Sequence, residues 1–192
     1  MVAIAPAFRT ASARAEPPST ADLQQAAQAL YRQHFEFVWR NARRLGCSDE
    51  WVDDAVHEVF MVATRRLPEF EGRSSERTWL FAITLRIVQR MQRDRARRHH
   101  HLSRYLAEQP PSVADAGEQS EAAAYLRHLL QQLPEGLRAV MILAELEGFT
   151  TAEIAESLDA PRGTIDSRLR KARIALSEAI ERDRARDRRF EK

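Results

Sequence analysis

The sequence has 192 residues and a mass of 22.0 kDa, enough for one medium-sized domain or two small ones, which excludes large catalytic barrels. Hydrophobic residues make up 44% of the chain and there are only 6 glycines and 8 prolines, so we expect a folded core. The single cysteine, Cys47, excludes an intramolecular disulfide, and no apolar run reaches the roughly 18 residues that cross a bilayer. We therefore expect a cytoplasmic protein.

The small net charge of +2 conceals blocks of opposite sign. Residues 49–58 contain five acids and no lysine or arginine, whereas residues 86–104 contain seven arginines and one acid. Residues 162–173 contain five basic side chains and one acid. Two separate basic blocks suggest two contacts with a polyanion, although a solvated helix face is the ordinary alternative for each.

The first part of the chain predicts a helical module. Residues 1–21 are rich in Ala, Pro, Ser and Thr without periodicity, and we expect a disordered tail there. Within residues 22–98, Gly46, Pro68 and Gly72 interrupt the helical pattern. We predict three helices, over about residues 23–45, 49–67 and 75–98. Their apolar stripes should form the core: Val52, Ala55, Val56, Val59, Phe60 and Ala63 in the second helix, and Trp79, Leu80, Ile83, Ile87 and Met91 in the third.

The second part predicts another helical module after a linker. Residues 99–120 are polar, contain Pro110, Pro111 and Gly117, and show no periodicity, so we expect a flexible linker. Residues 121–181 are divided by Pro134, Gly148 and Pro161, which predicts four helices, and residues 182–192 form a charged tail. The fold class is therefore all-α, with two small helical modules joined by a tether.

The last two predicted helices have the pattern of a helix-turn-helix. Thr150 and Glu153 have the spacing of a capping box, and Gly148 before them suits a left-handed end to the preceding helix. After a turn at residues 159–161, apolar residues recur on one face of the next helix: Ile165, Leu169, Ala172 and Leu176. The other faces are basic and polar near the helix N-terminus, the end that normally enters the major groove. Arg, Thr, Ser and Lys there can bond bases or phosphates, so we predict DNA binding.

These segments resemble a known family. GFTTAEIAESLDAPRGTIDSRLRKAR, from Gly148, resembles region 4.2 of bacterial RNA polymerase sigma factors, and LPEGLRAVMILAELEG before it resembles region 4.1. WVDDAVHEVFMVATRRLPEF, from Trp51, resembles region 2.2, and RTWLFAITLRIVQRMQR, from Arg77, resembles regions 2.3 and 2.4. The order of the matches and the short linker between them are similar to the extracytoplasmic-function (ECF) group.

The resemblance implies a transcription initiation factor that is not an enzyme and needs no metal or cofactor. Its partners would be core RNA polymerase, through the β′ clamp coiled coil and the β flap, promoter DNA, and an anti-sigma factor. Core binding would use Asp53, Asp54, His57, Glu58 and Phe60. The minus-ten element would be contacted by Arg73, Arg77, Trp79, Phe81, Arg86, Arg90 and Arg93. The minus-thirty-five element would be contacted by Arg162, Thr164, Ser167, Arg168 and Lys171, with Arg170 and Arg173 on phosphates.

Some positions depart from the family pattern. Asp159 stands where the turn usually has Gly, and Asp166 stands where a basic or neutral residue is common. A carboxylate at position 166 can accept from cytosine N4, so the preferred promoter sequence can differ. His57, Glu76 and Arg86 also replace the usual residue types. For Trp79, a place in the core stripe is the alternative to stacking on a base.

Two other functions compete with this interpretation. The carboxylates and His57 on one helix could serve an enzyme, but the second histidine of a zinc-protease motif and a glycine-rich phosphate loop are both missing. Three adjacent histidines at 99–101 point in different directions on a helix and do not favour a shared metal ion. An ordinary helix-turn-helix repressor remains the second alternative, and it would bind duplex DNA without polymerase.

Overall fold

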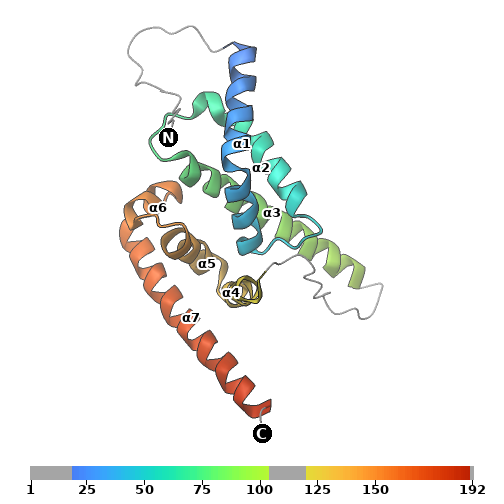
Figure 1. Cartoon of the computed structure of the whole chain (residues 1–192), viewed down its shortest axis with the longest axis vertical. Coiled ribbons are helices and arrows are strands. Elements are labelled where there is room, and N and C mark those ends of the chain that lie inside the picture. The colour runs from blue at the N-terminus through green and yellow to red at the C-terminus, as the bar shows by residue number, and fades with distance from the viewer. Residues whose placement is uncertain (1–18, 104–119, 191–192) are drawn as a thin grey trace.

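The computed structural model describes residues 19–103 and 120–190, and within these ranges the secondary structure is entirely helical. The first module consists of α1 (Thr20–Leu45), α2 (Val52–Arg66), the short η1 (Leu67–Glu69) and α3 (Glu76–Ser103). The second module consists of α4 (Glu121–Gln131), α5 (Glu135–Met141), the π-helical turn η2 (Ile142–Leu146), α6 (Thr151–Ser157) and α7 (Arg162–Phe190). Figure 1 shows the first module above the second, with α7 extending away from both.

Local signals account for the helix ends of the first module. Ser19 accepts a hydrogen bond from the backbone of Asp22, whose carboxylate in turn accepts from the Ser19 N–H, a capping box that starts α1. Gly46 ends α1 in the left-handed region, at φ 109°. The three predicted helices are confirmed, although the second starts at Val52 instead of residue 49 because residues 49–51 form turns.

The predicted apolar stripes form the core of the first module. All six stripe residues of α2 are buried, and so are Leu80, Ile83 and Ile87 of α3. Trp79 and Met91 are only partly buried and pack against the edge of that core. Burial of each large apolar side chain stabilises the fold by about 1.5–3 kcal/mol, which explains why the stripes determine the packing of α1, α2 and α3.

The helix-turn-helix of the second module is confirmed. Thr150 and Glu153 form the predicted capping box at the start of α6, after Gly148 adopts a φ of 74°. Asp159 occupies the turn with a φ of 48°. Ile154 of α6 packs with the buried face of α7, including Ile165.

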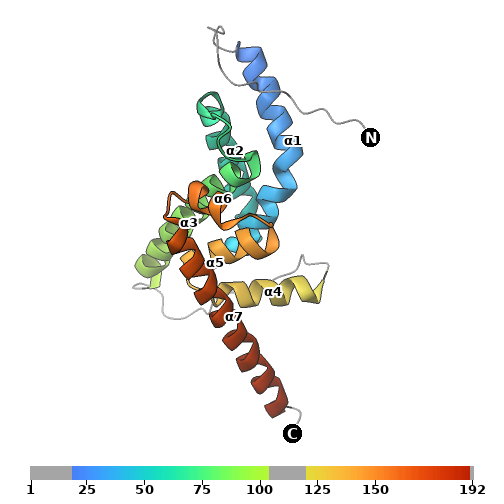
Figure 2. The same ribbon diagram turned by 90° about the vertical axis from the view of Figure 1, so that its left-hand side faces the viewer.

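Three segment boundaries differ from the prediction. The N-terminal tail is predicted over residues 1–21, but α1 begins at Thr20, and residues 1–18 lie outside the described residues. The linker was expected from residue 99, but α3 continues to Ser103, and residues 104–119 lie outside the described residues. The charged tail was expected from residue 182, but α7 continues as a helix to Phe190 (Figures 1 and 2). The extension of α7 is rich in arginine, a good helix former, and neither extension contains Pro or Gly. Within the described ranges, every helix is too short or too polar to span a bilayer.

The two modules pack against each other, which the description of two tethered modules did not predict. Buried apolar residues of both modules form one continuous cluster. At one end of the contact, Arg138 of α5 donates to the carbonyl oxygen of Leu45 at 2.9 Å, where α1 ends. At the other end, Ser157 of α6 donates to the carbonyl oxygen of Thr78 in α3 at 3.0 Å. The helical periodicity that predicts each module contains no signal for these contacts between modules.

Candidate nucleic-acid interface

The acidic block lies on the surface of α2. Asp53, Asp54 and His57 are exposed on its first two turns, on the side opposite the core stripe. Glu58 is partly exposed and forms an ion pair with Arg90 of α3. Phe60 is 7% exposed, and its ring lies 4.7 Å from that of the exposed Tyr31. The predicted core-binding residues therefore form one surface. Within it, the buried ring of Phe60 packs against the exposed ring of Tyr31.

The predicted minus-ten arginines follow the exposed side of α3 and the loop before it. Arg73, Arg77, Arg86, Arg90 and Arg93 are all exposed residues. Several of their guanidiniums are already paired within the protein. Arg73 lies 2.9 Å from Glu71, and Arg90 pairs with Glu58. Arg86, Arg90 and Arg93 are three or four positions apart on α3 and share a face, so they form a basic track along the helix. Arg77, nine positions before Arg86, projects from another side of α3, and Arg73 lies in the preceding loop.

Phe81 does not belong to this track. Its side chain is completely buried between the helices of the first module, so the prediction that it contacts the minus-ten element is wrong. The resemblance implied this contact, but the buried face of α3 is wider than the predicted stripe and includes Phe81.

Trp79 is instead half-buried and exposes part of its ring. Phe70, from the loop after η1, packs against it with ring centroids 4.7 Å apart. Both aromatics line a crevice of about 490 Å³ together with Arg73 and Arg86. Aromatic rings beside guanidiniums are the groups that hold an unstacked base and its phosphate. Sequence periodicity does not identify Phe70, because this residue lies in a loop.

The second basic surface is the first three turns of α7. Arg162, Asp166, Arg170 and Lys171 are exposed, whereas Thr164, Ser167 and Arg168 are partly buried. Ser167 donates to the carbonyl oxygen of Thr164 at 2.9 Å, which leaves its lone pairs available as acceptors. Arg173 forms a forked contact with Glu145, at 2.6 and 2.8 Å. Here α6 lies beside α7, as a helix-turn-helix requires.

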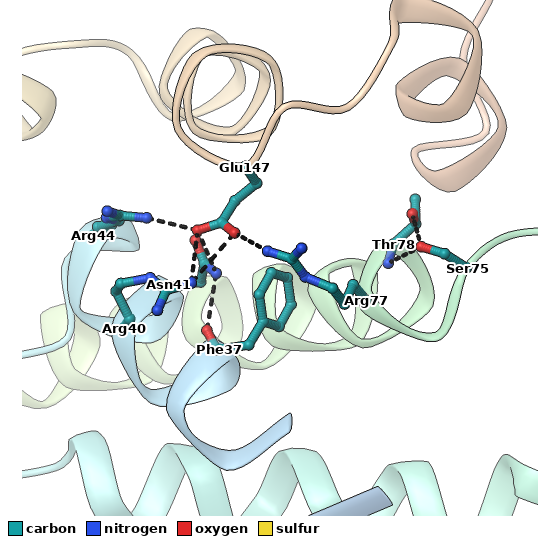
Figure 3. Close-up of polar contacts among 8 residues, drawn as sticks. All are labelled: Phe37, Arg40, Asn41, Arg44, Ser75, Arg77, Thr78 and Glu147. Atoms are coloured by element: carbon teal, nitrogen blue, oxygen red, sulfur yellow. Dashed lines mark hydrogen bonds and ion pairs between the residues drawn. The ribbon is translucent and has the colours of Figure 1, made fainter. Parts of the chain in front are cut away.

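The two modules meet at a buried carboxylate. Glu147 follows η2, and its side chain is only 1% exposed. It accepts from Arg77 at 2.5 Å, Arg44 at 2.6 Å and Asn41 at 3.2 Å, and each of its oxygens lies 3.3 Å from Arg40 (Figure 3). These four partners all belong to the first module. We call this group the Glu147 cluster.

Burial has an electrostatic cost within the cluster. Desolvation is the largest influence on Arg44 and lowers its pKa, and the opposite charge of Glu147 partly offsets it. Arg77 also lies over two aromatic rings, with its guanidinium carbon 4.7 Å from the centroid of Phe37 and 5.7 Å from that of Phe149. A buried carboxylate needs this number of donors, because an unpaired one would be strongly destabilising. Local sequence patterns do not reveal Glu147, since its partners are 70 to 107 residues away.

Comparison with known proteins supports the same division of the chain. Residues 30–98 match the family described as Sigma-70 region 2, and residues 123–176 match that described as Sigma-70, region 4. The ECF RNA polymerase sigma factor SigM of Mycobacterium tuberculosis is 30% identical over 152 residues, covering 79% of this chain and 75% of SigM. The ECF RNA polymerase sigma-E factor of Escherichia coli is 30% identical over 151 residues, covering 68% of this chain and 74% of that protein.

Two solved structures are also similar to this chain. CnrH, in complex with the cytosolic domain of CnrY, is 27% identical with a TM-score of 0.61, over 83% of this chain and 90% of CnrH. The sigma factor RpoE of Bartonella quintana, in complex with the anti-sigma factor NepR, shares the fold with a TM-score of 0.63 at 23% identity, over 84% of this chain and 98% of RpoE. The two ordered matches and these relatives show that the chain belongs to the sigma-70 family of RNA polymerase sigma factors, in its extracytoplasmic-function group.

Proposed function

We propose that this sigma factor binds core RNA polymerase through the acidic surface of α2 and positions promoter DNA along α3 and the N-terminal turns of α7. It recruits and opens DNA without catalysing a reaction itself, and it acts in the cytoplasm, where polymerase and chromosome are. The observation that carries this proposal is the separation of charge, with an exposed acidic face on α2 and exposed basic faces on α3 and α7.

Core binding is assigned to Asp53, Asp54, His57 and Glu58. Their side chains are exposed or partly exposed, and His57 lines a pocket together with the exposed apolar side chains of Tyr31 and Met61. A surface with acidic groups around apolar side chains is complementary to the basic clamp coiled coil of β′. Opposite charges accelerate association, and apolar contacts stabilise the complex once it has formed. Phe60 acts indirectly, since its ring packs against Tyr31.

The minus-ten element is assigned to Arg73, Arg77, Trp79, Arg86, Arg90 and Arg93, with Phe70 added and Phe81 removed. The crevice beside Trp79 and Phe70 offers stacking surfaces for an unpaired base, and the arginines neutralise phosphates along the strand. The minus-thirty-five element is assigned to Arg162, Thr164, Ser167, Arg168 and Lys171. Arg170 and Arg173 are assigned to phosphates.

Two more partners follow from the family and from a relative. The β flap of the polymerase is the second contact proposed for the second module. An anti-sigma factor is proposed from the family resemblance, and CnrH, at 27% identity, was likewise solved with a protein partner, the cytosolic domain of CnrY.

The test is run-off transcription from a promoter library with core polymerase, with and without the protein. The double variant Asp53→Lys, Asp54→Lys should abolish the protein-dependent start sites, because it reverses the exposed charge on α2. The matched control is Glu178→Lys, Glu181→Lys, which makes the same change at exposed positions of α7 and should leave start sites unchanged. Circular dichroism checks that both variants are folded.

The alternatives give different results. Binding to duplex DNA without polymerase and no specific initiation would replace the proposal with a helix-turn-helix repressor. Equal activity of the α2 variant and its control would remove core binding from this face of α2.

A further inference from the structure

The packing of the two modules covers groups that the proposed function assigns to DNA. Arg77, assigned to the minus-ten element, is bound by Glu147 of the second module. The turn of the helix-turn-helix lies over the same site, because Glu156, Ser157 and Asp159 line the crevice that contains Trp79 and Arg73. The site for an unpaired base therefore lies under the second module.

The recognition helix is also partly covered. Arg168 of α7 and Arg86 of α3 line a second crevice between the modules, with a volume of about 370 Å³. One arginine is assigned to the minus-thirty-five element and the other to the minus-ten element. Two elements separated along a promoter cannot both reach side chains that face each other in one crevice, so this closed arrangement must separate before both elements are bound.

Glu147 is the group best suited to hold the arrangement together. Its carboxylate is 1% exposed and has three guanidiniums and one amide of the first module within 3.3 Å. A carboxylate presents paired, negatively charged oxygens to these arginines, as a phosphate does. Glu147 therefore accepts from Arg77 the kind of charge-assisted hydrogen bond that a promoter phosphate would accept.

We propose that Glu147 holds this sigma factor in an autoinhibited closed conformation, in which the second module substitutes for promoter phosphate at Arg77 and covers the minus-ten crevice. The inference rests on the DNA contacts of the proposed function. Promoter DNA and Glu147 compete for Arg77, so opening of the module contact precedes productive binding. Charge-assisted hydrogen bonds stabilise the closed conformation relative to the open one. The loss of one such bond shifts the equilibrium between the closed and open conformations about tenfold or more toward the open one.

The experiment measures module separation and DNA binding in the full chain without polymerase. Single-molecule energy transfer is recorded between labels at the exposed positions Ala29 of α1 and Ala185 of α7, in a Cys47→Ala background. DNA binding is followed by anisotropy with a promoter fork that carries an unpaired minus-ten strand. The variants are Glu147→Gln, which removes the charge but keeps the shape, and Arg44→Gln, which acts from the first module.

Both variants should raise the open fraction and tighten fork binding about tenfold, because neither residue is assigned to DNA. The matched control, Glu178→Gln, removes one exposed carboxylate from α7 and should change neither quantity. Arg77→Gln should open the modules without tightening DNA binding, since it removes a DNA contact together with the Glu147 contact. Circular dichroism establishes that each variant is folded, and Arg44→Gln decides the result if Glu147→Gln unfolds the second module.

Unchanged energy transfer in Glu147→Gln and Arg44→Gln would overturn the proposal, because Glu147 would not hold the modules together. Opening without tighter fork binding would also overturn it, because the contact would then not be inhibitory. The energy-transfer measurement contains no DNA or polymerase, so its outcome is independent of the transcription assay that tests the proposed function.

Discussion

The guanidinium of Arg77 in α3 donates to the carboxylate of Glu147, at 2.5 Å and across 70 residues of sequence. Arg77 is the second residue of its helix, and Glu147 is the C-cap of η2, directly before Gly148. The contact therefore joins the start of the helix assigned to promoter opening with the segment that leads into the helix-turn-helix. It links the two modules through a carboxylate that Arg40 and Arg44 of α1 also contact.

The contrast between Phe81 and Phe70 gives the first prediction. Phe81→Ala should lower the free energy of unfolding by about 3–5 kcal/mol, because it leaves a cavity in a fully buried position. Phe70→Ala should cost much less stability but weaken promoter opening by about 1–3 kcal/mol, the contribution of one stacked base. Urea unfolding and open-complex formation measure the two effects. A larger loss of stability from Phe70→Ala would contradict the assignment of these two residues.

Much of the fold could be predicted from the sequence, because local rules determine it. The periodicity of α2, the capping box of Thr150 with Glu153 and the left-handed Gly148 all depend on residues a few positions apart. The contacts of Glu147 depend on residues from both modules, so local patterns carry no information about them. Phe81 was misplaced for a related reason, since periodicity indicates a stripe but not how far around the helix that stripe is covered.

The turn of the helix-turn-helix gives the second prediction. Asp159 has a φ of 48°, a conformation that costs most L residues energy and glycine almost none. Asp159→Gly should therefore stabilise the protein by about 0.5–1 kcal/mol, measured by urea unfolding. The comparison is Gly148→Ala, which places a Cβ at a φ of 74° and should destabilise. A loss of stability in Asp159→Gly would show that the carboxylate contributes more than the strain relief.

The capping box of α6 gives a dependence on pH. The backbone N–H and hydroxyl of Thr150 both donate to Glu153 at 2.7 Å, and these bonds lower the pKa of its carboxyl group. A lowered native pKa adds stability above the unfolded value of about 4.3, and that stability is lost as the pH falls through the lower native value.

Glu153→Gln should therefore remove part of the decrease in stability at acid pH. Thermal unfolding at pH 7 and at successive acidic values measures this decrease. Thr150→Ala should have a similar effect, because it removes the hydroxyl donor. Parallel pH curves for wild type and Glu153→Gln would show that the capping carboxylate is not responsible.

Cys47 should be unreactive in the folded protein. The residue is 4% exposed, and burial raises the pKa of its thiol, an effect larger than the opposing influence of Arg43 and Arg95. Since the thiolate is the reactive form, labelling with a disulfide reagent at pH 8 should be slow and should accelerate in urea together with unfolding. Complete labelling of the native protein within seconds would contradict this prediction and favour a redox role.

The last prediction separates base contacts from phosphate contacts on α7. Arg162 and Arg170 are both exposed, but Arg162 is the first residue of the helix, the end that enters the major groove. Arg162→Ala in complex with core polymerase should weaken binding by about 1–3 kcal/mol and should relax the preference at one position of the minus-thirty-five element. Arg170→Ala should weaken binding to all promoters alike and lower the slope of log affinity against log salt by about 1. Run-off transcription on promoters with single minus-thirty-five substitutions, together with salt titrations of binding, measures both effects. If Arg162→Ala lowered activity equally on every promoter, Arg162 would be a phosphate contact, and base recognition would lie further along α7.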